Sequence, residues 1–359
     1  MSFENRYSFT ERLLHRLAFA TPRLQIDYAE ADDEAFAKVS GAARADRPVF
    51  IAALPRAGTT LLLDLCAERP DFATHTYRHM PFLFTPLLWR RFSGRFQRDD
   101  APRERAHGDG MMVSADSPEA FEEMLWKAFW PNHYKADRIV PWTTEDGAAF
   151  KAFFQRHMAK IAALGATDPA RPPRYISKNN GNIARLGWLA KAIPDAAFIV
   201  PFREPLSHAG SLHHQHLNFL SLHAKDRFSR EYMAGVGHFD FGANLKPIDF
   251  DGWLAPGAFD ATQPDFWLRY WIAAYGHILR EHAERVMLVD YDALCEAPKT
   301  WLGAIGARLE LEPGAFDEAA GKIRNRPSTA RPELFDAALA DQARGLHDQL
   351  QQAARSRAA

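Results

Sequence analysis

The chain has 359 residues, of which 47% are hydrophobic, 12% aromatic and 25% charged, with a formal net charge of −1 at pH 7. This length suits one large α/β domain or two modest ones. The balanced charge argues against a global field that would attract nucleic acid or an anionic membrane. No run of about 18 apolar residues predicts a transmembrane span. The two cysteines, Cys66 and Cys295, lie in apolar helical contexts, which favours buried free thiols, a reducing compartment and a cytoplasmic location.

Strands and helices alternate along most of the chain. Residues 1–46 are predicted to be helical. The predicted strands cover residues 48–54, 174–178, 197–202 and 286–289, and the predicted helices cover 59–68, 120–130, 145–164, 183–193, 205–222, 265–282, 298–309 and the tail beyond 331. Residues 227–262 are rich in glycine and are predicted to form loops or a lid. This alternation predicts an α/β fold with a central parallel sheet covered by helices on both faces.

Three regions are predicted from this pattern. Residues 1–46 form an N-terminal helical extension, 47–330 the main domain, and 331–359 a C-terminal helical tail. Within the main domain, residues 80–145 are interrupted by prolines and charged runs. Trp, Phe and His side chains cluster in and around that insertion, which favours an aromatic-lined pocket there.

A strand, a tight turn and a helix start follow one another at residues 47–63. The apolar run predicts a buried strand, residues 55–58 a tight turn, and Thr59 the start of a helix. Such a unit presents backbone N–H groups and a helix N-terminus to an anion. The Walker pattern requires a Lys after its second Gly, whereas here Thr59 follows Gly58 and the cation, Arg56, lies inside the loop. The loop is therefore not that of an ATPase.

The string Pro-Arg-Ala-Gly-Thr-Thr at residues 55–60 resembles the 5′-phosphosulfate loop of sulfotransferases. These enzymes, with a P-loop-type three-layer fold, use 3′-phosphoadenosine 5′-phosphosulfate (PAPS) as donor. A transferred sulfuryl group carries less charge than a phosphoryl group, so Mg²⁺ and the Walker Lys are less needed than for a triphosphate. The resemblance implies that the donor is bound by Arg56, Ala57, Gly58, Thr59 and Thr60, and that Arg56 also takes part in catalysis. An ordinary turn and helix cap is the alternative for this string alone.

A second motif joins a strand that ends near Arg203 to a helix that begins at Pro205. The carboxyl ends of parallel strands are where α/β sheets bind ligands. A guanidinium can make a forked, charge-assisted contact with phosphate, and a Ser hydroxyl adds a hydrogen bond. In sulfotransferases an Arg–Ser pair at this spacing binds the 3′-phosphate of PAPS, so the resemblance assigns that role to Arg203 and Ser211. A surface Arg paired with Glu204 is the structural alternative.

A third motif is a strand that ends in Lys178. Sulfotransferases of the tyrosylprotein and bacterial type have a Lys at this place, and many have Pro where this chain has Asn180. A Lys that reaches the bridging oxygen would stabilise charge on the departing 5′-phosphate. The resemblance therefore implies catalysis by Lys178, with a structural cation at the sheet edge as the alternative. With a weaker match at residues 286–294, the resemblance extends in scattered blocks over about residues 48–310.

The general base is harder to place. Sulfuryl transfer to a hydroxyl gains from a group that takes the acceptor proton. Tyrosylprotein sulfotransferases carry a Glu about 21 residues after the loop Arg, a position that is Tyr77 in this chain. His79 is the predicted base because the unperturbed pKa of an imidazole lies near neutrality. His107, beside Asp109 in a glycine-flanked loop, is the second candidate. For each histidine, an ordinary surface or core residue is the alternative.

Three histidines at positions 213, 214 and 216 raise the question of a metal site. On a helix, His213 and His216 share a face but His214 points elsewhere, and no carboxylate or Cys completes a tetrahedral set. No metal is therefore expected. One or two of these histidines are predicted to line the acceptor pocket beside Ser211.

Together these motifs predict a sulfotransferase that moves a sulfuryl group from PAPS to a hydroxyl or amine of a small-molecule, glycan or lipid acceptor. The alternatives are a non-catalytic nucleotide-binding scaffold on the same fold and a P-loop kinase or nucleotide hydrolase, which the missing Lys after Gly58 disfavours. Neither nucleic acid nor a membrane is an expected partner, and a homodimer is left open.

Overall fold

A parallel sheet forms the centre of the computed structural model, which describes residues 9–40, 45–93, 103–104, 112–113, 117–143, 145–168, 171–255, 260–324 and 330–358. Within these residues, five strands lie in the order β2, β5, β1, β6 and β7, and each neighbouring pair is parallel. Their bounds are β1 (Val49–Ile51), β2 (Phe72–Ala73), β5 (Arg174–Lys178), β6 (Ala197–Phe202) and β7 (Met287–Asp290). A separate antiparallel pair joins β3 (Arg103–Glu104) to β4 (Met112–Val113).

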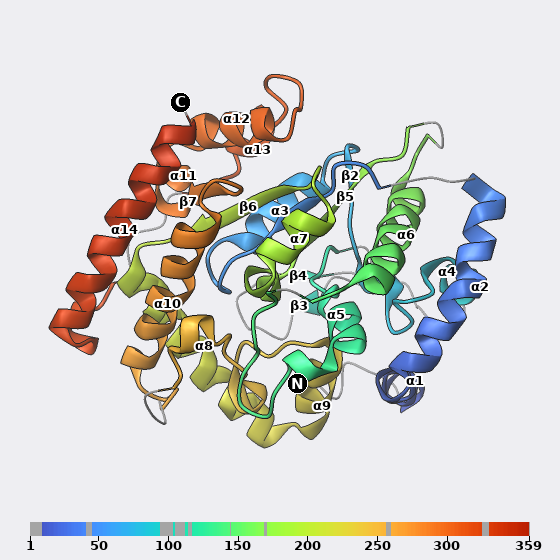
Figure 1. Ribbon diagram of the computed structural model, residues 1–359, viewed down its shortest axis with the longest axis horizontal. Helices are drawn as coiled ribbons and strands as arrows, with labels where there is room; N and C mark the ends of the chain where they lie inside the picture. Colours follow the sequence, from blue (N-terminus) through green and yellow to red (C-terminus); the bar gives the residue numbers. More distant parts are fainter. Residues whose placement is uncertain are drawn as a thin grey trace.

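Helices flank the central sheet (Figure 1). Helix α3 (Thr59–Ala67) contacts β1, β2 and β5, α6 (Ala148–Gly165) contacts β2 and β5, and α14 (Ala337–Ala358) contacts β7 at the opposite edge. Every residue of β1 and β6 is buried, which is typical of strands covered on both faces. The predicted α/β class, a parallel sheet flanked by helices, is confirmed.

The other helices connect the strands or extend the ends of the chain. They are α1 (Phe9–Ala20), α2 (Pro22–Ser40), α4 (Pro86–Ser93), α5 (Glu123–Phe129), α7 (Leu186–Ala192), α8 (Pro205–Lys225), α9 (Arg227–Val236), α10 (Pro264–His282), α11 (Tyr291–Glu296), α12 (Pro298–Arg308) and α13 (Asp317–Ala320). Among the described residues, no helix is long and apolar enough to cross a membrane. Both cysteines are buried and free, as predicted.

The two ends of the chain pack on opposite sides of the molecule (Figure 1). Helix α2 lies against α4 and α6, and α14 lies against α8, α10 and β7. The Gln351 side chain of α14 donates a 2.8 Å hydrogen bond to Asp290 at the end of β7. Both terminal segments are therefore fixed to the body, and the division at residues 46 and 330 stays a prediction.

The segment 227–262 differs from its prediction as loops or a lid, because it begins with helix α9. The carboxylate of Asp226 caps this helix by accepting a 2.8 Å hydrogen bond from the backbone N–H of Ser229. Phe228 and Tyr232, four residues apart, are buried on its inner face. Gly237, with φ of 83°, ends the helix in the left-handed conformation. The glycines thus terminate a helix here rather than exclude one.

Candidate functional site

The loop after β1 lies at the point where the sheet order reverses. β1 is flanked by β5 on one side and β6 on the other, and the chain leaves it into residues 52–58 and then α3. In open α/β sheets, ligands bind beside the carboxyl ends of strands at such a switch point. Arg56 has φ of 70° and Gly58 has φ of 96°, so the loop turns twice through the left-handed region. We call residues 55–60 the donor loop.

Gly58 is required at the start of α3. It caps the helix in the left-handed conformation, and no side chain caps the first-turn N–H groups. A Cβ at this position would lie 2.2 Å from Cδ2 of Tyr291. The backbone thus approaches an aromatic ring at a distance that only glycine permits, and it leaves the first N–H groups of α3 available to an anion.

Arg203 and Ser211 lie beside the donor loop, as the second motif predicts. Nη1 of Arg203 donates to the carbonyl of Arg56 at 3.1 Å, and Nε of Arg56 donates to Oγ of Ser211 at 3.4 Å. The Arg203 guanidinium lies over the ring of Tyr291 at 5.3 Å. Its Nε is buried without a hydrogen-bond partner among the described residues. Because an unpaired buried donor is costly, this atom indicates a missing acceptor.

The turn from β6 into α8 holds Arg203 in place. Glu204 caps α8, since its carboxylate accepts from the backbone N–H groups of Leu206 at 3.1 Å and Ser207 at 2.7 Å. Its own backbone N–H donates to Asp292 at 2.7 Å. The structural alternative, an ion pair between Arg203 and Glu204, is absent from the described residues. The Glu204 carboxylate caps α8 instead of pairing with the Arg203 guanidinium.

His208, which the sequence motifs did not single out, makes a hydrogen bond to the donor loop. This fully buried residue of α8 donates from Nε2 to the carbonyl of Pro55 at 2.8 Å. Burial is the main cause that lowers the pKa of His208 to about 3, and the nearby charges of Arg203 and Arg56 add to it. The imidazole is therefore neutral at neutral pH and ties α8 to the loop.

His208 makes the stability of the fold sensitive to acid. Its folded pKa of about 3 lies below the unfolded value, so below a pH of about 6.5 the unfolded chain binds a proton that the folded chain does not. This contribution is complete above about pH 6.5 and falls by about 1.4 kcal/mol per pH unit as the pH drops towards the folded pKa. His208→Gln keeps an N–H donor but cannot titrate. In urea unfolding at pH 7.5 and 5.5, the variant should lose less stability than the unaltered protein; equal losses would contradict the assignment.

Lys178 ends β5 directly beside Ile51 of β1, so it faces the same edge of the sheet as the donor loop. A buried network fixes the residues that follow it. Glu123 of α5 accepts from Asn179 at 2.8 Å and pairs with the guanidinium of Arg185. That guanidinium lies over the ring of Trp126 at 4.2 Å. The network makes the position of Lys178 depend on α5.

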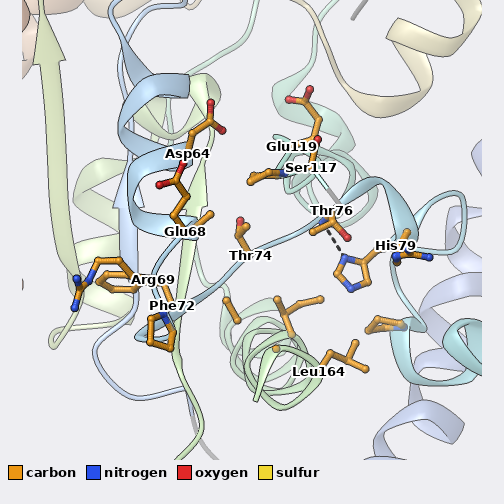
Figure 2. Close-up of a pocket in the computed structure, with 18 of the residues that line it drawn as sticks. Asp64, Glu68, Arg69, Phe72, Thr74, Thr76, His79, Ser117, Glu119 and Leu164 are labelled. Atoms are coloured by element: carbon orange, nitrogen blue, oxygen red, sulfur yellow. Dashed lines mark hydrogen bonds between the residues drawn. The ribbon is translucent and has the colours of Figure 1, made fainter. Parts of the chain in front are cut away.

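A cavity of about 1120 Å³ opens beside the donor loop (Figure 2). Thr60 of the loop, Asp64 and Glu68 of α3, and Ser117 and Glu119 contribute to its polar part. Apolar side chains line another part of it, among them Phe72, Ala73, Pro86, Ile161 and Leu164. In Figure 2, Asp64 and Glu119 lie at the top and Phe72 and Leu164 at the bottom. The cavity can therefore hold a molecule with a polar end near the donor loop and an apolar body.

Comparison with known proteins identifies the family of this site. Residues 48–239, more than half of the chain, match the model of the sulfotransferase family. The chain belongs to the sulfotransferase family. The matched range includes the donor loop, Lys178, Arg203 and Ser211. Membership of the tyrosylprotein-like branch stays a prediction.

Solved structures with a similar chain path are also sulfotransferases. Sulfotransferase STF9 from Mycobacterium avium is 14% identical over 90% of this chain and 81% of its own, with a TM-score of 0.48. Sulfotransferase STF1 from Mycobacterium tuberculosis H37Rv is 15% identical over 93% of this chain and 83% of its own, with a TM-score of 0.48. The sulfotransferase domain of the Synechococcus PCC 7002 olefin synthase is 16% identical over 87% of this chain and 95% of its own, with a TM-score of 0.33. Among curated proteins, none matches the chain significantly.

Of the two histidines predicted as bases of this sulfotransferase, only His79 is among the described residues. His79 lies in a 3₁₀ turn (Tyr77–His79) and lines the cavity. Its Nδ1 accepts from the backbone N–H of Thr76 at 3.0 Å. Burial, with a smaller effect of Arg90, lowers the pKa of His79 to about 4. His107 lies outside the described residues.

The side chains of His213, His214 and His216 on α8 do not converge. His213 donates to the carbonyl of Thr262 at 2.7 Å, and His216 accepts from the backbone N–H of Gly242 at 3.1 Å. His214 is exposed. In the part of the chain that the structure describes, no three His, Cys, Asp or Glu side chains are grouped as metal ligands would be. Each histidine of this group is thus accounted for by local structure.

Proposed function

We propose that this sulfotransferase transfers a sulfuryl group from PAPS to a hydroxyl of a small-molecule, glycan or lipid acceptor, with an amine as the second acceptor type. The observation that carries the proposal is the buried, unpartnered Nε of Arg203 beside the donor loop. A nucleotide with a 3′-phosphate would supply the missing acceptor atom. Ser211 lies next to Arg56 and adds a hydroxyl for the same phosphate.

The residues present fit the donor. The 5′-phosphosulfate would lie against the first N–H groups of α3, with the backbone of Ala57 and Gly58 close to it and the hydroxyls of Thr59 and Thr60 within the same turn. Because Gly58 has no side chain, its backbone can lie close to Tyr291 and the N–H groups at the start of α3 stay unobstructed. Arg56 and Lys178 are the cations we assign to the sulfuryl group and to the departing 5′-phosphate.

We place the acceptor in the cavity beside Thr60. Its hydroxyl oxygen would attack sulfur from the side opposite the departing phosphate, and adenosine 3′,5′-bisphosphate would be released. This mechanism places the acceptor hydroxyl near the polar end of the cavity and its body along the apolar part. A cytoplasmic location and a homodimer belong to the same proposal, the first supported by the two free cysteines.

Calorimetry with adenosine 3′,5′-bisphosphate and radiolabelled PAPS turnover test the proposal together. We expect the bisphosphate to bind and PAPS to be consumed in the presence of an acceptor. A protein that does not bind the bisphosphate is no PAPS enzyme. Binding without turnover across a broad acceptor panel would support the scaffold alternative, and Mg²⁺-dependent ATP turnover would support a kinase or hydrolase.

Arg203→Ala isolates the 3′-phosphate contact. The variant should bind adenosine 3′,5′-bisphosphate more weakly by about 1.5–3 kcal/mol, because it loses a charge-assisted hydrogen bond. Its affinity for adenosine 5′-monophosphate, which lacks the 3′-phosphate, should change far less. Arg227→Ala is the matched control, since this Arg is 89% exposed and pairs only with Glu231 of its own helix. Equal losses for both nucleotides would refute the assignment of Arg203 to the 3′-phosphate.

A further inference from the structure

Two segments distant in sequence meet at the polar end of the cavity. Thr76 and Pro118 form an isolated antiparallel bridge, and the backbone N–H of Glu119 donates to the carbonyl of His75 at 3.0 Å. These contacts bring Glu119 to Tyr77, whose hydroxyl donates to Oε2 of Glu119 at 2.8 Å. A carboxylate therefore lies beside the position where a Glu was sought in the sequence, although it comes from another part of the chain.

The Glu119 carboxylate is held in one orientation. Oε2 accepts from Tyr77, and Oε1 accepts from the backbone N–H of Ala120 at 2.8 Å. Hydrogen bonds to the charged form favour ionisation. Glu119 is thus a positioned carboxylate in the wall of the cavity that contains Thr60 of the donor loop.

Glu119 and Lys178 both lie close enough to His238 for their charges to act on it. Burial is the main cause that lowers the pKa of His238; Asp240 and Glu119 act to raise it, and Lys178 acts to lower it. The opposite charges of Glu119 and Lys178 thus act on one imidazole. His79 lies instead on the side of α4, where Arg90 lowers its pKa. Figure 2 shows Glu119 at the top of the cavity and His79 apart from it on the right.

We propose that Glu119 is the general base of the sulfuryl transfer and that Tyr77 is its positioning residue; this rests on the proposed function. The acceptor oxygen forms its bond to sulfur with one of its lone pairs. The bond from sulfur to the bridging oxygen breaks, and that oxygen leaves with adenosine 3′,5′-bisphosphate. The acceptor proton passes to Glu119 and returns to solvent after the product leaves. No metal and no redox partner takes part in this balance.

The test compares two acceptors, 1-octanol and 4-nitrophenol, that are small enough for the cavity and differ in their need for a base. The hydroxyl of 1-octanol is a very weak acid, whereas 4-nitrophenol is largely ionised at pH 8. Glu119→Gln should lower kcat for octanol by about 10²- to 10⁴-fold and leave kcat for 4-nitrophenol within about tenfold of the unaltered protein, since an ionised acceptor needs no general base. Tyr77→Phe should lower kcat for octanol less and move the acidic limb of kcat/KM to higher pH, because the carboxylate loses a hydrogen bond to its charged form.

Glu310→Gln is the control, because Glu310 pairs with Arg47 at the surface and is not among the residues that line the cavity. This variant should keep its activity on both acceptors. Equal losses on octanol and 4-nitrophenol in Glu119→Gln would reduce Glu119 to a structural role and overturn the proposal. The same applies if the octanol-specific loss appears in His79→Gln or Asp64→Asn instead.

Binding of adenosine 3′,5′-bisphosphate is measured for each variant, so a failure of the donor site is distinguished from a failure of the base. Bisphosphate binding without transfer to either acceptor in the unaltered protein would overturn the acceptor placement and this proposal with it.

Discussion

Gly58→Ala should bind adenosine 3′,5′-bisphosphate about 30-fold more weakly than the unaltered protein in calorimetry. Two costs add at this position. Alanine would be held at φ of 96°, a backbone conformation that costs a non-glycine residue about 1–3 kcal/mol. Its Cβ would also lie 2.2 Å from the ring of Tyr291, and such overpacking typically costs about 1–3 kcal/mol.

The ring of Tyr291 is the reason that this strain reaches the nucleotide. Arg203 lies over the same ring and donates to the carbonyl of Arg56. Any shift of Tyr291 that relieves the clash therefore moves Arg203, and any shift of the backbone changes the N-terminus of α3. Both routes disturb groups that we assign to the donor. The penalty of about 2–6 kcal/mol is divided between stability and affinity, so urea unfolding of the variant is measured beside the calorimetry.

Gly210→Ala is the control for Gly58→Ala. Gly210 is the residue before Ser211 on α8, and a Cβ there would meet no atom within 4 Å. Alanine is also the better helix former. This variant should bind the nucleotide as the unaltered protein does. If Gly58→Ala and Gly210→Ala behave alike, the close approach to Tyr291 is unimportant and the donor loop tolerates a side chain.

The parts of the site that follow one another in sequence were predictable. The β1–loop–α3 unit and the β6–α8 junction are each continuous, so their turn residues and cations lie in a fixed order whatever the rest of the chain does. The structure accordingly brings both Arg203 and Ser211 within hydrogen-bond distance of Arg56. Strand Arg174–Lys178 was also predicted with its observed bounds.

The parts that depend on contacts between distant segments were not predictable. The meeting of Tyr77 and Glu119 requires residues 117–119 to lie along residues 75–76, and no local pattern indicates that pairing. The bond from His208 to Pro55 joins residues 153 positions apart. A histidine on an apolar helix face could equally have been an ordinary core residue. The prediction of His79 followed sequence proximity to the loop, whereas Glu119, the base that we propose, lies 42 residues after Tyr77.

A buried ion pair between α2 and α6 was also absent from the sequence prediction. Nζ of Lys160 lies 2.9 Å from Oδ2 of Asp32 and 2.8 Å from Oδ1 of Asp33. The side chains of Lys160 and Asp32 are fully buried. Oδ1 of Asp32 also accepts from the backbone N–H of Leu88 in α4 at 2.7 Å. Lys160 thus joins α2 to α6, and Asp32 joins α2 to α4; α4 and α6 both border the cavity.

Lys160→Met should lower the free energy of unfolding by about 3–5 kcal/mol, because it leaves a buried carboxylate without its counter-ion. Urea unfolding of the full chain measures this loss. Arg156→Gln is the matched control: Arg156 bonds to Asp33 at 2.6 Å from the same helix, but half of its side chain is exposed. A pair of that kind contributes about 0–1 kcal/mol.

Adding Asp32→Asn to Lys160→Met should recover part of the lost stability, because the double variant no longer buries a lone charge. A recovery would show that the cost of Lys160→Met is electrostatic rather than a loss of packing. If Lys160→Met and Arg156→Gln lose the same small amount, water reaches the pair and Lys160 is not what holds α2 in place. Because α2 contacts α4 and α6, and both helices contribute residues to the cavity wall, a loosened α2 should also weaken acceptor binding while leaving the affinity for adenosine 3′,5′-bisphosphate unchanged. That separation follows from the fold, since Arg203 follows β6 and Ser211 lies on α8, whereas the Lys160 pair joins α6 to α2.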